Sequence, residues 1–411
     1  MVRMTDFRAG SKLLLIFAVL ILLTGCWSRR ELNELSIIVG IGVDWENGKY
    51  VVSYQVVNPG EVASQKQASE RAPVTLYQSK GDSMFEAARR LTTEAPRKAY
   101  LGHLQLLVVG EKVARHGIID VMDNLLRDNE ARLDFNVIVA KGEKAENILE
   151  IYTPLEKLPT QNMRHSLETS ERNWAPAIAM TMDEMASILS ANNGIRLVLP
   201  GIHIVGDEHL ATKKENVFRY RPPGRFQFTE MAVFKEGKLI GWLNEKESRG
   251  YTDLTDKLQS TSVKLPCSEP GLIGVEIAGS NAKTKALVKN GKPTVEVTIR
   301  TKANVVEKIG CGKVDLTDPD TIDRLGKQLE QEMRKNAEAS LKRAKALKAD
   351  IFGFGQALNR GNPQLWEKLK LRWDDEYFPQ LPVTIHIKAD ILRTGTIGNT
   401  NLNKNEMRKE G

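Results

Sequence analysis

Between Leu35 and about residue 200, short runs of β-branched residues alternate with segments whose apolar residues recur every three or four positions. Continuous apolar runs are typical of buried strands, and the longer period is typical of helices packed on a sheet. Two of the runs flank Asn47-Gly48, a pair that favours a tight hairpin. The alternation predicts an α/β domain over residues 26–200. Strands are predicted at 35–43, 50–57, 74–80, 103–109 and 132–140, and helices at 82–94, 113–126 and 144–152.

The second half of the chain has a different pattern. Residues 201–265 are β-rich, with a hairpin centred on Glu236-Gly237, and are expected to form a small middle domain. Residues 266–398 are expected to form a C-terminal domain in which strands, with a hairpin at Asn290-Gly291, accompany a long amphipathic helix over 318–348. The sequence therefore predicts a mixed α/β (α+β) protein of three domains with mixed β-sheets flanked by helices and with a lipid-anchored N-terminus.

The prediction of a lipid anchor comes from the first 26 residues. Basic residues precede an apolar run over 13–23, which is shorter than the ~20 residues that span a bilayer as a helix. Leu23-Thr24-Gly25-Cys26 follows and matches the lipobox of bacterial lipoproteins, so residues 1–25 are predicted to be a signal peptide. Cys26 is then expected to carry a covalent diacylglycerol and an acyl chain such as palmitate, as an N-acyl diglyceride cysteine. In the alternative interpretation the signal peptide is ordinary and Cys26 is incidental.

Composition limits the partners of the exported chain. Of its residues, 41% are hydrophobic and 27% are charged, which is typical of a soluble globular protein. Basic residues are spread along the chain and lack interleaved aromatic residues, so no nucleic-acid partner is expected. The net charge of +7 fits both a mild attraction to anionic lipid head groups and a generic soluble surface. The polar tail, residues 399–411, is predicted to be disordered.

Besides Cys26, the chain contains two cysteines, Cys267 and Cys311. Both lie beside loop-forming residues, and an even number of cysteines in an exported chain suits a disulfide. Two cysteines so far apart in sequence need not meet, so a disulfide and two free thiols both stay open.

Motifs for catalysis are absent from the sequence. None of the six histidines has zinc-site spacing, and no nucleophile elbow or phosphate-binding glycine loop occurs. His203 and His209 bracket two acidic residues and are interpreted as part of a solvated loop. We therefore predict no catalytic, metal-binding or cofactor-binding residues, and the protein is not expected to be an enzyme.

Several stretches together resemble the Ger(x)C family, the C subunits of spore germinant receptors. The first is Cys26-Trp27-Ser28-Arg29-Arg30, directly after the lipobox. The resemblance covers nearly the whole chain in the family's order. The matching stretches are 26–35, 40–44, 55–59, 230–235, 241–250, 349–355, 363–366 and 373–379.

The resemblance implies a lipoprotein on the outer face of the inner spore membrane. It would act with membrane-embedded A and B subunits in a receptor for a small-molecule nutrient, and its fold would contain three α/β domains. No catalytic residue transfers from the family. Two other functions stay open, namely a lipid-anchored solute-binding protein that itself holds the nutrient and a cell-wall enzyme delivered to the spore cortex.

Structural roles are expected for most residues of the matching stretches. Trp242 is predicted to anchor a core, and Gly353 is predicted to end the long helix in a left-handed conformation. Phe352 and Phe354 are expected to dock on the sheet. In the first domain, Asp82 is expected to cap the helix that follows it.

Overall fold

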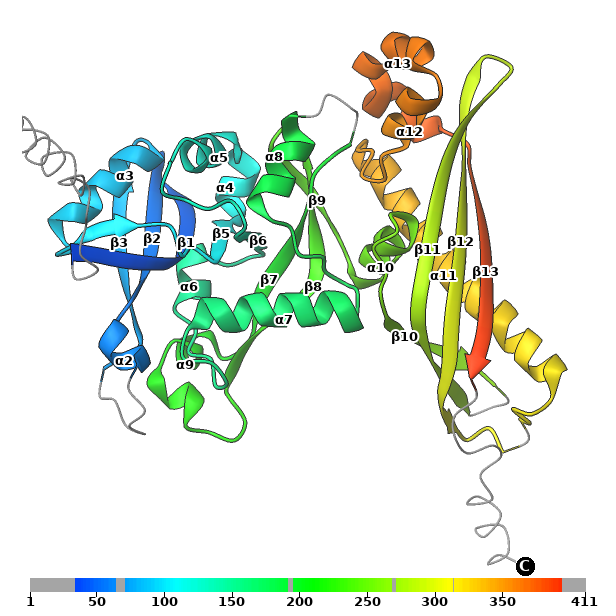
Figure 1. Ribbon diagram of the computed structural model, residues 1–411, viewed down its shortest axis with the longest axis horizontal. Helices are drawn as coiled ribbons and strands as arrows, with labels where there is room; N and C mark the ends of the chain where they lie inside the picture. Colours follow the sequence, from blue (N-terminus) through cyan, green and yellow to red (C-terminus); the bar gives the residue numbers. More distant parts are fainter. Residues whose placement is uncertain (1–33, 64–70, 191–194, 268–270, 313, 394–411) are drawn as a thin grey trace, which may run out of the picture.

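The structure is a computed structural model that describes residues 34–393 except 64–70, 191–194, 268–270 and 313. The predicted signal peptide, Cys26 and the tail 399–411 lie outside the described residues. Two mixed sheets form two lobes that lie next to each other along the long axis of the molecule (Figure 1). The mixed α/β fold predicted from the sequence is confirmed.

The first sheet contains nine strands, in the order β3-β2-β1-β5-β6-β7-β8-β9, with β4 paired to β1. Its centre, β1-β5-β6-β7, is parallel, and antiparallel strands lie on both sides. The strand bounds are β1 Leu35–Glu46, β2 Lys49–Val57, β3 Val74–Gly81, β4 Lys98–Tyr100, β5 Leu106–Gly110, β6 Asn136–Ala140, β7 Val198–Gly206, β8 Gly224–Lys235 and β9 Lys238–Leu243.

Helices cover both faces of this sheet, as a parallel sheet requires. In β5, Leu107 and Val109 pack with α3, α4, α5 and α8, whereas Leu106 and Val108 pack with α6, α7 and α9. Neighbouring residues of a strand thus enter opposite cores. The helices of this lobe are α2 Pro59–Ala63, α3 Met84–Arg90, η2 Leu91–Thr93, α4 Glu111–His116, α5 Ile119–Leu126, α6 Ala145–Leu149, α7 Pro159–Asn173, α8 Met182–Ser190, α9 Glu208–Ala211 and η3 Lys214–Val217.

The second sheet has the order β10-β11-β12-β13, and its β12-β13 pair is parallel. The long helix α11 packs along it through Leu325, Leu329 and Met333. Its elements are α10 Glu245–Leu254, β10 Thr261–Pro266, β11 Leu272–Lys289, β12 Lys292–Ile309, α11 Pro319–Leu347, α12 Phe354–Gly361, α13 Pro363–Leu369, η4 Lys370–Arg372, η5 Trp373–Tyr377, α14 Phe378–Gln380 and β13 Val383–Arg393.

The predicted hairpins are confirmed. Asn47, Glu236 and Asn290 each adopt a positive φ of 50° to 53°, and the glycine after each has a positive φ as well. Two consecutive left-handed residues make the turn whose twist matches that of antiparallel strands.

The three-domain division stays a prediction, although β7, β8 and β9 of the expected middle domain are hydrogen-bonded into the first sheet. Two predictions about helix ends differ from the structure. Ser83, not Asp82, caps α3, because its side chain accepts the amide of Glu86. Lys348, with φ 52°, is the left-handed residue that ends α11, whereas Gly353 precedes α12.

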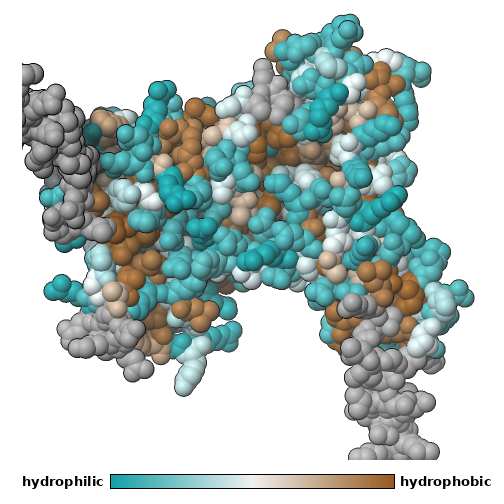
Figure 2. Space-filling model, viewed as in Figure 1, coloured by the Kyte–Doolittle hydropathy of each residue, from teal (hydrophilic) through white to brown (hydrophobic). Residues whose placement is uncertain are grey.

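The lower end of the second lobe carries a disulfide and an apolar surface. Cys267 and Cys311 are bonded to each other, with their Cα atoms 6.0 Å apart. Apolar side chains gather near this end in Figure 2, and Val306, Ile309 and Leu392 are each more than half exposed near the ends of β12 and β13. Among the described residues, no helix combines the length and apolar character needed to cross a membrane.

Candidate functional site

The junction of the two sheets is built around α10, which follows β9 directly. Its N-terminus has a capping box, because the Asn244 side chain accepts the amide of Glu247 (3.0 Å) and the Glu247 carboxylate accepts the amide of Asn244 (2.9 Å). The helix contacts β8 and β9 of the first sheet, and β11, β12 and α11 of the second. It is therefore the element through which the two lobes pack (Figure 1).

One glycine sets how closely α10 approaches α11. A Cβ on Gly250 would overlap the carbonyl of Asn336 and lie 2.9 Å from the amide nitrogen of Ala337. The two helix backbones are thus in direct contact. A residue with a side chain has no room at this crossing unless the helices move apart.

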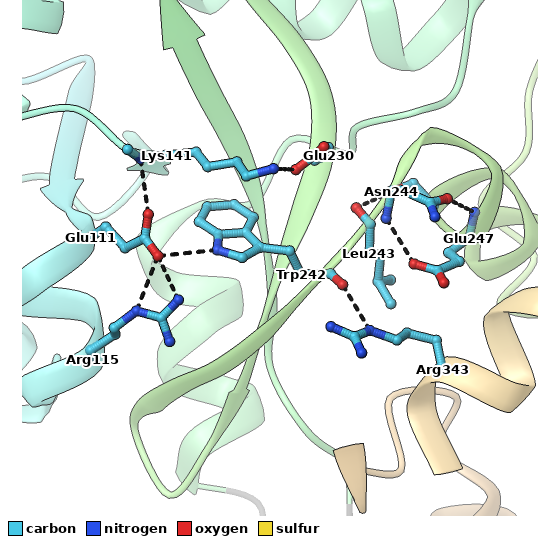
Figure 3. A network of polar contacts seen from close by, with 11 residues as sticks. Glu111, Arg115, Lys141, Glu230, Trp242, Leu243, Asn244, Glu247 and Arg343 are labelled. Atoms are coloured by element: carbon cyan, nitrogen blue, oxygen red, sulfur yellow. Dashed lines mark hydrogen bonds and ion pairs between the residues drawn. The ribbon is translucent and has the colours of Figure 1, made fainter. Parts of the chain in front are cut away.

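Trp242 of β9 lies at the centre of a polar network (Figure 3). Its indole Nε1 donates to Glu111 Oε1 (3.4 Å), and the Lys141 ammonium lies 5.5 Å from the ring centroid. Lys141 also pairs with Glu230. On the other side, the carbonyl of Trp242 accepts Nε of Arg343 from α11 (3.1 Å). A single residue thus binds the first lobe through its side chain and the second lobe through its backbone.

The Glu111 carboxylate is the acceptor that organises this network. Burial acts to raise its pKa, but hydrogen bonds from the Gly142 amide (2.9 Å) and Arg115 outweigh burial, and the pKa lies below its usual range. Glu111 is therefore ionised at neutral pH. Its negative charge balances Arg115 and orients the indole of Trp242.

A second network surrounds Asp350, which is completely buried. Its carboxylate accepts the amides of Phe352 (3.2 Å), Phe354 (3.2 Å) and Gly355 (2.7 Å), and Nε1 of Trp373 (2.8 Å). Burial raises its pKa to about 6, although the hydrogen bonds act in the opposite direction. This carboxylate fixes the turn between α11 and α12, and the packing of Phe352 and Phe354 in the core is confirmed.

The Asp350 network reaches the first lobe through Arg196, just before β7. Asp374 accepts the amide of Asp350 (3.0 Å) and Nε of Arg196 (2.6 Å). The amide of Arg196 in turn donates to the carbonyl of Asp350 (3.0 Å). Lys235 of β8 pairs with Asp375 nearby (2.8 Å). Polar contacts thus join the lobes at two places, through a hydrogen bond at Trp242 and through ion pairs near Arg196.

Ionisable side chains of α10 are also buried between its neighbours. Asp253 is 4% exposed, and burial raises its pKa to about 8, although the charge of Arg249 opposes the rise. The guanidinium of Arg249 lies 4.1 Å from the ring centroid of Trp174, and burial lowers its pKa. Asp253 is therefore largely protonated at neutral pH, which fits a carboxyl inside an interface between lobes.

Three cavities lie near these elements. One of about 310 Å³ is lined by Arg196, Tyr251 and Phe352, and one of about 520 Å³ by Ile119, Phe234 and Trp366. The third, of about 400 Å³, lies between α7 and the first half of β8. Its lining combines polar and aromatic side chains, including Asn162, Ser166, Ser170, Gln227, Phe226 and Phe228.

The predicted site residues that the structure describes lie away from the junction. Cys26, the predicted lipidation site, is outside the described residues, and the Cys267–Cys311 disulfide is at the end of the second lobe. The prediction of a solvated loop around His203 and His209 is wrong, because His203 belongs to β7 and His209 to α9, which the Asp207 carboxylate caps. Within the described ranges, no cluster of three or more His, Cys, Asp or Glu side chains is placed to hold a metal ion.

The basic face of the long helix α11, which includes Arg334, Arg343 and Lys345, is partly used inside the protein. Arg334 donates to the carbonyl of Ile385, and Lys345 to that of Leu381. Arg343 binds Trp242, as described above. This face therefore attaches α11 to its own lobe and to the first lobe.

Comparisons with known proteins agree along the whole chain. Residues 28–204 match the family model "Spore germination protein N-terminal domain", and residues 229–395 match "Spore germination B3/GerAC like, C-terminal". Spore germination protein KC of Bacillus subtilis is 33% identical over 94% of this chain and 96% of its own length. Spore germination protein B3 of the same organism is 23% identical over 95% and 100%. The crystal structure of the GerBC protein matches with a TM-score of 0.54 at 18% identity, over 86% of this chain and 97% of that chain.

Four of the stretches that carry the family resemblance meet at the junction of the lobes. Residues 230–235 and 241–250 contain Glu230, Lys235, Trp242 and α10, and residues 349–355 and 373–379 contain the Asp350 network. The sequence did not predict that these stretches lie together. The only signal was the presence of indole and carboxylate side chains within apolar stretches, which indicates buried polar contacts but not their partners. With the matches of both family models and of protein KC, the chain belongs to the Ger(x)C family of spore germination proteins.

Proposed function

We propose that this chain is the lipid-anchored C subunit of a nutrient germinant receptor on the outer face of the inner spore membrane. The observation that carries the proposal is the 33% identity to spore germination protein KC over 94% of the chain. Because both lobes and the junction between them are included in this match, the functional unit is the whole two-lobed chain. The A and B subunits, embedded in the membrane, are its proposed partners.

The anchor is proposed to be a diacylglycerol and an acyl chain on Cys26. Two or more chains hold a protein at a membrane far more firmly than one, at about 0.8 kcal/mol per buried methylene. The test is a gene deletion complemented with the wild type, with Cys26→Ala or with Ser28→Ala as the control, followed by measurement of spore germination on single nutrients. We expect Cys26→Ala to lose the response and Ser28→Ala to keep it. An unchanged response of Cys26→Ala to every nutrient would refute the anchor.

Partnership with the A and B subunits is tested by purification from spore membranes. An affinity-tagged chain, solubilised in mild detergent, is expected to bring down two multi-span membrane proteins. The Cys26→Ala variant should bring down much less of both, because it is not held at the membrane. Recovery of the tagged chain alone from wild-type membranes would contradict the proposed complex.

The proposed role is not enzymatic. In the polar networks around Glu111 and Asp350, the carboxylates accept hydrogen bonds from backbone amides, from indoles and, for Glu111, from Arg115. Such side chains are positioned by neighbours on all sides and point toward structural partners. This supports a function in transmitting or assembling, not in chemistry on a substrate.

The cavity between α7 and β8 favours a second candidate function, a solute-binding lipoprotein that itself holds the nutrient. Its volume of about 400 Å³ suits a small molecule, and its lining residues include hydroxyl, amide and aromatic side chains. Calorimetric titration of the full chain with a panel of amino acids and sugars tests this candidate. A flat titration counts against it, and heat that persists in a cavity-filling Ser166→Trp variant excludes this cavity as the site.

A further inference from the structure

The segment between α9 and β8 exposes two aromatic side chains. Phe218 is 74% exposed, and Tyr220 has a relative exposure of 112%, which is full exposure. Figure 1 shows this segment extending below the first sheet, at the end of the molecule opposite α13. Large apolar side chains are normally packed, so two of them at one loop tip call for a partner.

The segment between α9 and β8 is held firmly at its ends, although Phe218 and Tyr220 in its middle are exposed. Asn216 is 1% exposed, and its Nδ2 donates to the carbonyls of Tyr152 (2.9 Å) and Gly224 (3.0 Å). Its Oδ1 accepts the amide of Gly224 (3.1 Å), and the amide of Asp207 donates to the carbonyl of Pro223 (3.0 Å). A buried side chain thus joins the two ends of the loop. The aromatic tip is presented on a firm support.

The charge of the loop points to an anionic surface. Aromatic and basic residues alternate in Phe218-Arg219-Tyr220-Arg221, contrary to the expectation that basic residues lack interleaved aromatics. The basic residues of the loop and its ends are Lys213, Lys214, Arg219, Arg221 and Arg225, against a single acidic residue, Glu215. Tyrosine favours the head-group level of a bilayer, and arginine and lysine are drawn to anionic lipids.

A second feature points in the same direction. The end of the second lobe that carries the exposed residues Val306, Ile309 and Leu392 extends to the same side of the molecule as the loop (Figure 1). A flat surface on that side meets both projections. The same surface cannot reach α13, at the opposite end.

We propose that the loop from Lys213 to Arg221, here named the aromatic-basic loop, inserts Phe218 and Tyr220 into the head-group region of an anionic bilayer. The inference rests on the proposed location of the chain at a membrane and adds a second point of contact to the lipid on Cys26. A tether alone leaves the protein free to rotate. Contact through this loop sets which side of both lobes faces the membrane and which side stays available to partners.

The test uses the full acylated chain with Tyr220→Cys, labelled with a fluorophore that responds to polarity. The protein is reconstituted into phosphatidylglycerol vesicles and, separately, into phosphatidylcholine vesicles. Leu371→Cys is the matched control, because Leu371 is 90% exposed between Lys370 and Arg372 but follows α13. We expect a blue shift and quenching by spin-labelled lipid for the Tyr220 position in phosphatidylglycerol only, and neither for Leu371.

Charge reversal sharpens the test. Arg219→Glu with Arg221→Glu, in the labelled Tyr220→Cys chain, is expected to lower the ratio of inserted to free loop roughly tenfold or more. Equal spectra for the Tyr220 and Leu371 positions, in a chain that floats with the vesicles, overturn the loop proposal but not the lipid anchor. A chain that does not float refutes the proposed membrane location itself. A blue shift that appears only when other receptor subunits are added shows a protein partner and also overturns the loop proposal.

Discussion

Replacing Gly250 with alanine tests the junction of the lobes most directly. The change adds one methyl group at the crossing of α10 and α11. That methyl would overlap the carbonyl of Asn336 and approach the amide nitrogen of Ala337 to 2.9 Å. Both are backbone atoms of α11, so no side-chain rotation relieves the overlap. The helices must separate, and the contacts of α10 with both sheets loosen with them.

Two effects of opposite sign decide how much Gly250→Ala changes the free energy of unfolding. Alanine is more stable than glycine inside a helix by about 1 kcal/mol, which favours the variant. Overpacking costs typically 1–3 kcal/mol, and the upper end applies where only rigid backbone is displaced. The net expectation is a loss of about 2 kcal/mol in the free energy of unfolding. For roughly 350 residues unfolding together, this corresponds to a decrease of about 3 °C in Tm.

Thermal and urea unfolding, followed by tryptophan fluorescence, measure the loss. Gly361→Ala is the matched control, because Gly361 also belongs to a helix, α12, and its added Cβ would lie 3.8 Å from the carbonyl of Ala286, an ordinary contact. We expect the control to be at least as stable as the wild type, because the same helix preference acts there without an overlap. A Gly250→Ala protein as stable as the wild type, or an equal loss in Gly361→Ala, would show that the crossing is not tightly packed.

Three further predictions concern buried polar groups and the disulfide. The pKa of Asp253 is raised by burial from 3.8 to about 8, so the native state retains a proton that the unfolded chain releases, and stability falls as the pH rises from about 4 to about 8. Asp253→Asn should flatten that loss in urea unfolding at pH 5 and pH 8, and an unchanged slope would contradict it. The Cys267–Cys311 disulfide joins residues 44 positions apart, so its removal should lower the free energy of unfolding by about 3–4 kcal/mol. Equal urea midpoints with and without reductant would count against this prediction. Asp350→Ala should lower the free energy of unfolding by about 3 kcal/mol or more, because four buried N–H donors lose their acceptor. Hydrogen exchange at the Gly355 amide should become faster, and an amide that stays protected would refute this role.

Local signals in the sequence predicted the hairpins and most strands of the first lobe. Asn47-Gly48 and Asn290-Gly291 succeed because the turn depends only on the φ angles that two adjacent residues tolerate. The long helix succeeds for a similar reason, since Asp318 caps it and its apolar residues keep one period over eight turns. In each case the deciding interactions lie within a few residues of one another.

Predictions failed where several local solutions compete. Gly353 was expected to end the long helix, but Lys348 is the residue that adopts the left-handed conformation there. The chain turns at this point so that the Asp350 carboxylate can accept hydrogen bonds from amides within the next five residues. Similarly, α7 and α10 were not predicted. The mean hydropathy of α10 is low, and its buried residues include Ser248, Thr252 and Asp253. A helix buried through polar side chains gives no apolar stripe to detect.

The contacts at the junction of the lobes could not be predicted from the spacing of residues in the sequence, for a physical reason. Arg196 and Asp374 are 178 positions apart, and Lys141 and Glu230 are 89 apart. Lys141 and Glu230 meet only after β6, β7 and β8 have paired in the first sheet, and Arg196 and Asp374 meet only after the two lobes have packed together. A charge in such a pair looks like any surface charge in the sequence, because its burial is a property of the assembled lobes. Four stretches of the family pattern, far apart in sequence, thus lie together at this junction, where Trp242, α10 and the Asp350 network connect the two lobes.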